Sequence, residues 1–364
     1  MTIIIKMTLK ELRLKGQLDC LLNPVKKPKT VFKKKIGGAD EAKLLETRDI
    51  MPALDDIRRG DKLSYALIAP AFLGQFSNNV TSGKLRSALK AVGFDGVIEV
   101  ALFADILTLK EALEFDRDIH TERDFQLTSC CCPIWIAMIR KNYGRLLPRV
   151  PPSVSPMIAG GRVIKKLHPN ALTVFIGPCV AKKAEAKEPD LIGAIDHVLT
   201  FRETRNIFDA LSVNPADMPE TEKDHSSHAG RIYAREGGVS RAVAMTVKRL
   251  NPERKIPVRP QTADGVAACR AMLEELEAGA SAGTGRAAGS PNFFEGMGCR
   301  GGCAGGPKSI ISTDECVKNI DAYAGKASFA TPLDNPYTIE LLYRLGFKTV
   351  ESLVSDNEFF TRKL

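Results

Sequence analysis

Cysteines are the residues of this chain best suited to chemistry, and six of the nine fall in three short segments. The first reads Thr-Ser-Cys-Cys-Cys-Pro-Ile-Trp over 128–135, and the second reads Gly-Pro-Cys-Val-Ala-Lys-Lys-Ala-Glu over 177–185. The third, Glu-Gly-Met-Gly-Cys-Arg-Gly-Gly-Cys-Ala-Gly-Gly-Pro, covers 295–307. Adjacent cysteines do not readily bridge one another, because disulfide geometry is narrow. An odd number of cysteines without a recognisable signal peptide therefore indicates metal binding or catalysis.

The third segment has the composition expected of a loop around an iron–sulfur cluster. Cysteine thiolates hold such clusters, usually four to a cubane. Glycines surround Cys299 and Cys303, and they allow the backbone to approach a cluster closely and to donate N–H groups to its sulfurs. Two other interpretations remain. One is a glycine-rich surface loop with incidental cysteines, and the other is a zinc site, although its usual paired spacing occurs only once here.

In this order, the three segments resemble the three signature motifs of the iron-iron hydrogenase active-site domain. Residues 69–76 resemble the first strand and loop of that family, and residues 195–200, 237–239 and 334–343 also occur in family-like order. The resemblance covers about residues 63–350. It implies an enzyme that reversibly interconverts protons and electrons with H2. It also implies the H-cluster, a 4Fe–4S cubane joined through one cysteine to a diiron unit with CO, cyanide and a bridging azadithiolate.

The resemblance also implies roles for individual cysteines. Cys132, Cys179, Cys299 and Cys303 would hold the cubane, with Cys303 as the bridge to the diiron unit. Cys131 would be the thiol that relays protons to the bridging amine, which requires hydrogen-bond reach, directly or through one water. Three other cysteines, Cys20, Cys269 and Cys316, have no motif context and are expected to be ordinary packed or exposed thiols.

Lys182 would place its ammonium beside one cyanide, since an anionic ligand in a dry pocket needs a compensating donor. A surface position for Lys182 and ordinary core packing for Met297 and Tyr233 are the alternatives. The non-cysteine residues expected around the cofactor are Lys182, Glu185, Met297, Tyr233, Ala69, Pro70 and Ala71. The three residues 69–71 would offer backbone donors to the other cyanide.

The chain departs from the family pattern at the first motif, which has three cysteines where two are usual. Alignment on Cys-Pro makes Cys130 the additional one, and a shift by one residue would exchange the relay and ligand roles. Gly177 stands where many members have methionine, and Met157 where many have glutamine.

The proton exit also departs from the pattern. Family members use two glutamates before the relay thiol and a serine after it. Matching the helix from its start places Ala112 at a glutamate position, whereas counting back from Cys131 favours Glu111 and Glu114. Pro151 falls near the serine position, where Ser153 or water could substitute.

Apolar runs predict buried strands at 65–70, 97–102, 172–176 and 195–200. Helical spacing predicts helices over 82–92, 107–115, 134–147, 237–249, 262–276 and 336–345, and a flexible loop follows at 279–290. The alternation indicates an α/β fold. We expect two lobes, each with a small, mainly parallel sheet flanked by helices, and the cofactor in the crevice between them. Cys179 follows a strand directly, which is the usual location of sites in such sheets.

We expect a basic N-terminal extension over 1–60, a catalytic domain of two lobes over 61–350 and a C-terminal tail over 351–364. The net charge is +9, and lysines gather at Lys26, Lys27, Lys29, Lys33, Lys34 and Lys35. This run could steer an acidic ferredoxin, or it could simply be a solvated tail. Aromatic residues make up 6% of the chain, too few near the lysines for a nucleic-acid platform. No apolar run is long enough for membrane insertion, and we expect a cytoplasmic protein.

Only Cys20 precedes residue 130, so accessory clusters are expected on a partner subunit, if anywhere. Maturation proteins would have to build the diiron unit. Two other functions fit the same motifs: a sensor of H2 with slow turnover, and a non-catalytic hydrogenase-like iron–sulfur assembly protein. The presence of Cys131 and Lys182 argues against the second.

Overall fold

The computed structural model describes residues 18–26, 42, 44–45, 47–128, 131–221, 224–281, 287–356 and 358–364. Cys130, expected to be the additional cysteine of the first motif, lies outside the described residues. Lys33, Lys34 and Lys35 of the basic extension lie outside them too.

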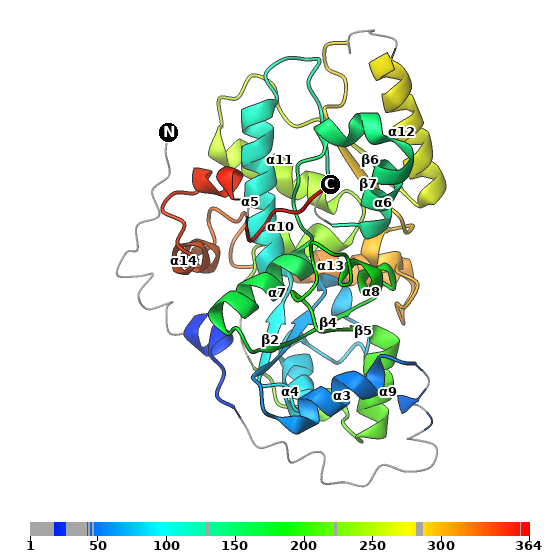
Figure 1. Cartoon of the computed structure of the whole chain (residues 1–364), viewed down its shortest axis with the longest axis vertical. Helices are drawn as coiled ribbons and strands as arrows, with labels where there is room; N and C mark the ends of the chain where they lie inside the picture. The colour runs from blue at the N-terminus through cyan, green and yellow to red at the C-terminus, as the bar shows by residue number, and fades with distance from the viewer. Residues whose placement is uncertain are drawn as a thin grey trace.

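One sheet forms the core of the lower lobe in Figure 1. Its strands are β1 (Ser64–Ile68), β2 (Gly96–Glu99), β4 (Leu172–Gly177) and β5 (His197–Thr200), paired in parallel in the order β2-β1-β4-β5. β1 and β4 are buried along their whole length, which explains their continuous apolar sequences. Four helices pack on the sheet: α3 (Ile50–Arg59), α4 (Ser82–Val92), α7 (Pro156–Leu167) and α9 (Phe201–Ala210).

A second parallel sheet lies in the upper lobe. Its strands are β3 (Gln126–Leu127), β7 (Phe293–Met297) and β6 (Pro260–Asp264), in the order β3-β7-β6. The helices α6 (Pro133–Asn142), α11 (Gly238–Leu250) and α12 (Val266–Ser281) pack against it. The prediction of a helix over 262–276 was wrong at its start, because β6 occupies residues 260–264. This strand has one buried residue, Ala263, and hence no apolar alternation to reveal it.

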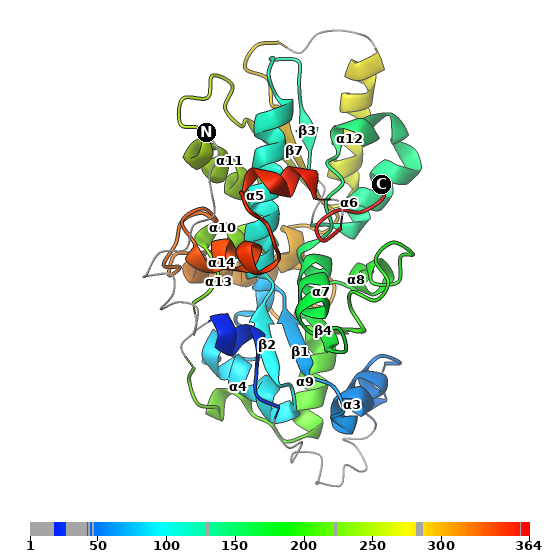
Figure 2. The same cartoon turned by 60° about the vertical axis from the view of Figure 1, so that its left-hand side comes forward.

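The long helix α5 (Ala101–Asp118) connects the two lobes, and every residue from Ala101 to Phe115 is buried. It contacts α7, α10 (His228–Arg231), α11 and α14 (Pro336–Arg344), and Figure 2 shows these helices around it. The expected strand at 97–102 therefore ends earlier, and the expected helix at 107–115 extends in both directions. A helix buried on all sides has no polar face that would mark its ends.

The remaining elements are one further helix and several short helical turns. They are η2 (Pro70–Phe72), η3 (Gly144–Arg149), α8 (Ala181–Glu185), η4 (Pro215–Asp217), η5 (Ile232–Ala234), η6 (Gly302–Gly305), α13 (Thr313–Ala324) and η7 (Glu351–Ser355). The expected α/β fold with two small parallel sheets is confirmed. Among the described residues, none of the helices is long and apolar enough to cross a membrane.

Candidate functional site

The candidate site lies where the strands of both sheets end. β1 leads into Ala69 and Pro70, and β4 leads into Pro178 and Cys179. In the other sheet, β3 is followed by the first cysteine segment, and β7 runs into the third. Because the strands of each sheet are parallel, these segments meet at one edge of each sheet, the usual location of ligand sites in α/β folds.

The four cysteines expected to hold a cubane line one cavity of about 330 Å³. We call it the thiol cavity. Its other lining residues are Cys131, Pro133, Ile134, Lys182, Met297, Gly298, Gly302 and Gly306. Cys132, Cys179, Cys299 and Cys303 are all free of disulfides, and the N–H of Gly298 donates to Sγ of Cys132 at 3.3 Å.

The spread of these sulfurs indicates which kind of metal group fits. Across the described ranges, no three His, Cys, Asp or Glu side chains are grouped so that they could hold a metal ion. A cubane makes a different demand, because four thiolates bind it around its periphery. Four sulfurs around one cavity fit that demand. A closed zinc site would instead need its ligands gathered around a single ion.

Burial dominates the electrostatics of the thiols. It raises the pKa of Cys299 to about 11 and raises the pKa of Cys303 well above its ordinary value, and neighbouring thiols add to both effects. Burial also raises the pKa of Cys179, but Lys182 and the N–H groups of Lys182 and Ala181 oppose this rise. A cation and backbone N–H donors at the start of α8 thus favour a thiolate at Cys179.

A second cavity of about 430 Å³ adjoins the first. Its lining residues are Ala69, Pro70, Val100, Ala104, Cys131, Pro156, Met157, Phe175, Lys182, Tyr233, Ala234 and Cys303. Cys131, Lys182 and Cys303 line both cavities. The other walls of the second cavity are almost entirely apolar. The junction therefore carries two thiols and one ammonium.

Lys182 is buried and not a surface lysine, with 6% of its surface exposed. Its Nζ donates to Oε2 of Glu185 at 2.7 Å. Burial by itself lowers the pKa of Lys182, but the carboxylate of Glu185 raises it overall. Oε1 of Glu185 lies 3.8 Å from Nη1 of Arg362, which also pairs with Glu188. The ammonium that faces both cavities thus belongs to a buried ionic network.

Most of the other expected residues reach the site. Met297 is 1% exposed and lines the thiol cavity, with its Sδ 4.0 Å from Sγ of Cys131. Tyr233 lines the second cavity and is also buried. Glu185 contacts the site through Lys182 and is not itself a lining residue of either cavity.

The segment 69–71 is only partly placed as expected. Ala69 and Pro70 line the second cavity, whereas Ala71 is buried in η2 and is not a lining residue. The N–H of Ala69 donates to the carbonyl of Ile176 at 2.9 Å, and proline has no N–H. Ala71 is therefore the remaining backbone donor of this segment.

Two carboxyl groups of α5 are the candidates for the expected proton exit. Glu111 and Glu114 are both buried. Glu111 follows Ala104 by seven residues, which places it on the face of α5 that lines the second cavity. Burial raises the pKa of Glu114, and its ion-pair partner Lys110 opposes this. Ala112, the residue of the other register, is buried as well, so burial fits both registers.

The hydroxyl that reaches α5 comes from Ser153. Nζ of Lys110 donates to Oγ of Ser153 at 3.1 Å, and Pro151, near the expected serine position, is half-buried. Lys110 was not predicted as a site residue, although a lysine inside an apolar helix is a signal that could have indicated it. Arg362 was also missed, and nothing in the spacing of the C-terminal residues pointed to it.

A larger hollow lies elsewhere in the described part of the chain. It measures about 1420 Å³ and is lined by residues that include Phe76, Arg205, Ser212 and Ile311, with no cysteine among them. Volume alone therefore does not locate the chemistry of this protein.

Comparison with known proteins agrees with the site. Residues 62–307 match the family model described as the iron only hydrogenase large subunit, C-terminal domain. The chain belongs to this family, which implies an iron–sulfur H-cluster.

Among curated relatives, iron hydrogenase 1 of Clostridium pasteurianum is 30% identical over 199 residues, covering 50% of this chain and 34% of the relative. The NADP-reducing hydrogenase subunit HndD of Solidesulfovibrio fructosivorans is 27% identical over 348 residues, covering 82% of this chain and 60% of the relative. The chain thus spans less than two thirds of the length of these relatives.

Solved structures share the fold. The FeFe hydrogenase HydA(deltaEFG), from a study of stepwise H-cluster assembly, matches with a TM-score of 0.61 and 23% identity, covering 84% of this chain and 93% of that one. A variant of HydA1 from Chlamydomonas reinhardtii matches with a TM-score of 0.59 and 23% identity, over the same shares of the two chains.

Proposed function

We propose that this chain is the catalytic domain of an iron-iron hydrogenase, which interconverts two protons and two electrons with H2. The observation that carries the proposal is the pair of adjoining cavities, one lined by four thiols and the other apolar, which meet at Cys131, Lys182 and Cys303. A cubane that is held by four thiols, one of which is shared with a second metal unit, needs this arrangement.

Cys132, Cys179, Cys299 and Cys303 would hold the 4Fe–4S cubane, and Cys303 would be shared with the second cavity. When bound, the cubane and the diiron unit with CO, cyanide and azadithiolate would supply the electron transfer and the H2 chemistry. The protein would supply thiolate ligands and a dry pocket. The walls of the second cavity would exclude water, which protects reactive groups from side reactions.

Cys131 would move the proton. Its thiol is 8% exposed and faces the second cavity. Apolar surroundings keep a cysteine neutral at ordinary pH, so that it can donate a proton and recover it. Glu111, Glu114 and Ser153 would carry protons onward along α5, supported by their burial and by the hydrogen bond between Lys110 and Ser153.

Lys182 would stabilise an anionic ligand of the diiron unit, because its ammonium lines both cavities and is a strong donor to an anion placed there. Glu185 would fix the position of that ammonium. Ferredoxin or a similar acidic carrier would deliver electrons, maturation proteins would install the diiron unit, and a partner subunit could hold accessory clusters.

The test is an infrared spectrum of the anaerobically matured protein in the CO and cyanide stretching region. Metal-bound bands that shift under H2 are expected. A cubane signal without such bands would contradict the proposal and favour an assembly role. Bands with negligible turnover would instead favour a sensor.

A Lys182→Met variant sharpens this test. We expect it to retain the cubane, because the four thiols remain, but to lose most of the CO and cyanide bands. A Lys187→Met variant serves as a matched control, since Lys187 is exposed. Unchanged band intensities in Lys182→Met would exclude the proposed role of its ammonium.

A further inference from the structure

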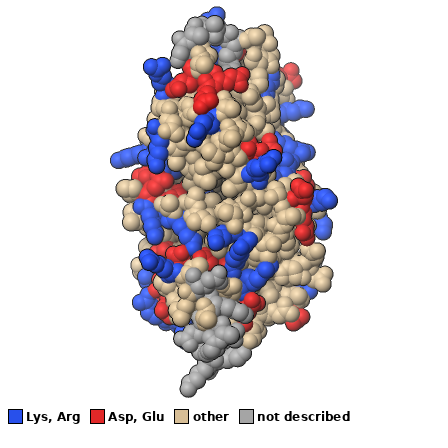
Figure 3. All heavy atoms as spheres, turned by 90° about the vertical axis from the view of Figure 1, so that its right-hand side faces the viewer, with Lys and Arg blue, Asp and Glu red and all other residues tan. Residues whose placement is uncertain are grey.

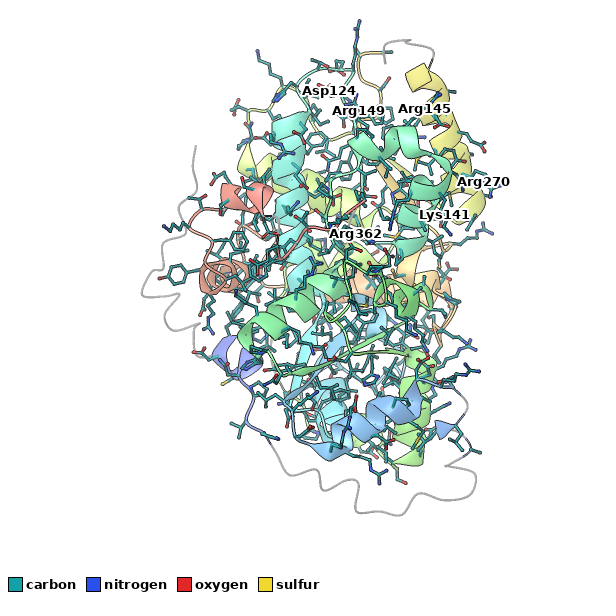
Figure 4. All side chains as sticks on the ribbon, viewed as in Figure 1. Asp124, Lys141, Arg145, Arg149, Arg270 and Arg362 are labelled. Atoms are coloured by element: carbon teal, nitrogen blue, oxygen red, sulfur yellow. The ribbon has the colours of Figure 1, made fainter. Side chains whose placement is uncertain are left out.

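Cys269 lies on the inner face of α12, next to the third cysteine segment. Its side chain is fully buried and begins a stripe of buried residues at helical spacing, continued by Met272, Leu273 and Leu276. The outer face of the helix carries Arg270, which Figure 4 labels on the right-hand side of the molecule. Figure 3 looks at this side, where charged and uncharged side chains cover the surface. Cys269 is therefore a thiol shielded from water.

The thiol of Cys269 has two carbonyl groups as partners. Its Sγ lies 3.3 Å from the carbonyl oxygen of Met297 and 3.4 Å from that of Ala263. A carbonyl oxygen only accepts hydrogen bonds, so the sulfur is the donor and carries its hydrogen. An S–H group is a weak donor in water, but in a buried site of low dielectric its hydrogen bond is stronger.

The carbonyl of Met297 belongs to a peptide unit that contacts a cubane ligand. The N–H of the same unit, that of Gly298, donates to Sγ of Cys132 at 3.3 Å. The carbonyl also accepts the N–H of Gly265 at 2.8 Å. This one peptide thus accepts hydrogen bonds from Gly265 and Cys269 through its oxygen and donates one to Cys132 through its nitrogen.

Resonance couples the two ends of a peptide unit. A hydrogen bond to the oxygen favours the form in which the C–N bond has double-bond character and the nitrogen carries less electron density. The N–H then becomes a better donor, and bonds in such a chain strengthen one another. A hydrogen bond to a ligand sulfur stabilises the reduced, more negative state of a cluster and so raises its reduction potential.

We infer that Cys269 is a positioning residue that raises the reduction potential of the cubane, acting on Cys132 through the Met297–Gly298 peptide. The inference rests on the proposed function, because it requires a cubane on the four thiols. In the reduction itself, one electron passes from the reductant, which is oxidised, to the cubane. The hydrogen of Cys269 stays on Sγ, and no bond forms or breaks.

The experiment uses the full chain loaded with the cubane but without the diiron unit. Titration with dithionite in the presence of redox mediators, followed by electron paramagnetic resonance, measures the midpoint potential of the cubane. Cys269→Ala is the test variant, since it removes the donor. Cys269→Ser is the conservative variant, since it also shortens the side chain but retains a hydroxyl donor.

Cys316→Ala is the matched control. Cys316 is also fully buried, and its Sγ lies 3.6 Å from the carbonyl oxygen of Ala71. Neither Cys316 nor Ala71 lines the thiol cavity. The control therefore removes a buried thiol donor that does not act on a cubane ligand.

We expect Cys269→Ala to lower the equilibrium constant for reduction of the cubane. Loss of one hydrogen bond from a chain weakens the next by about 10–30%, which should change the constant about twofold. For one electron, at about 59 mV per tenfold change, this is a decrease of about 18 mV. Cys269→Ser should have a potential at or above that of the unchanged protein, and Cys316→Ala should leave the potential unchanged.

Equal decreases in Cys269→Ala and Cys269→Ser would overturn the inference, because the lost volume and not the lost donor would then be the cause. An unchanged potential in Cys269→Ala, or an equal decrease in Cys316→Ala, would overturn it too. If Cys269→Ala does not hold the cubane, Cys269→Ser decides the matter: a potential at or above that of the unchanged protein supports the inference, and a lower one overturns it.

Failure of the proposed function is distinguishable from failure of this inference. A cubane that does not assemble in the unchanged protein would contradict the proposed function. The titration itself requires neither the diiron unit nor H2 turnover, so it tests the role of Cys269 alone.

Discussion

At the scale of single residues, the first and third cysteine segments are fitted to each other. Gly296 of the third segment packs on the ring of Trp135, and an added Cβ would lie 2.1 Å from Cε3 of that ring. The indole N–H of Trp135 donates to the carbonyl of Thr128 at 2.9 Å. The tryptophan thus fixes both ends of the first segment, and only glycine fits against it.

This contact predicts the behaviour of Gly296→Ala. Overpacking of this kind costs about 1–3 kcal/mol, and the displaced ring should disturb the segment that carries Cys132. We expect lower unfolding stability and less iron per chain. Because the protein has one tryptophan, its fluorescence reports the displacement directly.

Gly279→Ala is the matched control for that prediction. An added Cβ at Gly279 meets nothing within 4 Å, and alanine is the better helix former there. If both variants have the same iron content and emission spectrum, the fit between the two segments does not matter.

Residue types in motifs were predictable from the sequence, whereas long-range partners were not. The four thiols and Lys182 line one cavity, and the resemblance of their motifs to the family had already grouped them around one cofactor. The burial of Lys110 with Glu114 and Ser153 depends on how residues 152–154 pack against α5. Nothing local in the sequence encodes that contact.

At the scale of elements, Asp105 joins three helices. This residue of α5 accepts hydrogen bonds from the N–H and Oγ of Ser227, which caps α10, and from Nδ2 of Asn335, which caps α14. Burial raises the pKa of Asp105 to about 6, although Ser227, Asn335 and Arg231 oppose the rise. The joint between the helices therefore depends on pH.

The sign of that dependence follows from linkage. A carboxyl with a raised pKa in the folded state binds protons more tightly there than in the unfolded chain. Its contribution to stability therefore falls as pH rises from about 4 to about 6, by roughly 3 kcal/mol at about 1.4 kcal/mol per unit of pKa.

Urea unfolding of the protein and of Asp105→Asn across this pH range measures the contribution. The unfolding free energy of Asp105→Asn minus that of the unchanged protein should rise by roughly 3 kcal/mol as the pH rises from about 4 to about 6. This expectation holds whatever the absolute stability of the variant. Parallel pH profiles would mean that Asp105 has an ordinary pKa.

Elements were predictable where burial leaves a periodic pattern. α4 was predicted with its observed bounds, since one face is buried and the other is not. β6 was not predicted, because only Ala263 is buried in it. The helix predicted for α5 was too short, because the burial of α5 is nearly uniform. Uniform burial and uniform exposure both remove the periodicity on which such predictions depend.

At the scale of the whole molecule, two hydrophobic clusters correspond to the lobes. The larger surrounds the four-stranded sheet and α5, and the smaller lies among α6, α12 and the three-stranded sheet. Among the C-terminal residues, Phe359 and Phe360 belong to the larger cluster, and Leu364 packs against the smaller one. The N–H of Val154 donates to the carbonyl of Phe360, and the N–H of Arg362 donates to that of Pro152, each at 2.9 Å.

These C-terminal contacts lead to a prediction for Arg362→Met. Arg362 is 5% exposed and pairs with buried Glu185 and half-buried Glu188, so its removal takes one cation from each carboxylate. Breaking a buried pair completely costs about 3–5 kcal/mol, and the loss here should be smaller because Lys182 still pairs with Glu185 and Arg140 with Glu188. In contrast, Arg117→Met breaks an exposed pair with Asp118, for which about 0–1 kcal/mol is expected.

Deletion of residues 358–364 should cost more than Arg362→Met, because Phe360 is fully buried and its apolar contacts would be lost as well. Urea unfolding of the two variants and of Arg117→Met measures the order. Equal stability of Arg362→Met and Arg117→Met would show that the buried network around Glu185 does not support the fold. The expected order would instead mean that the C-terminal segment stabilises the network that positions Lys182 at the junction of the two cavities.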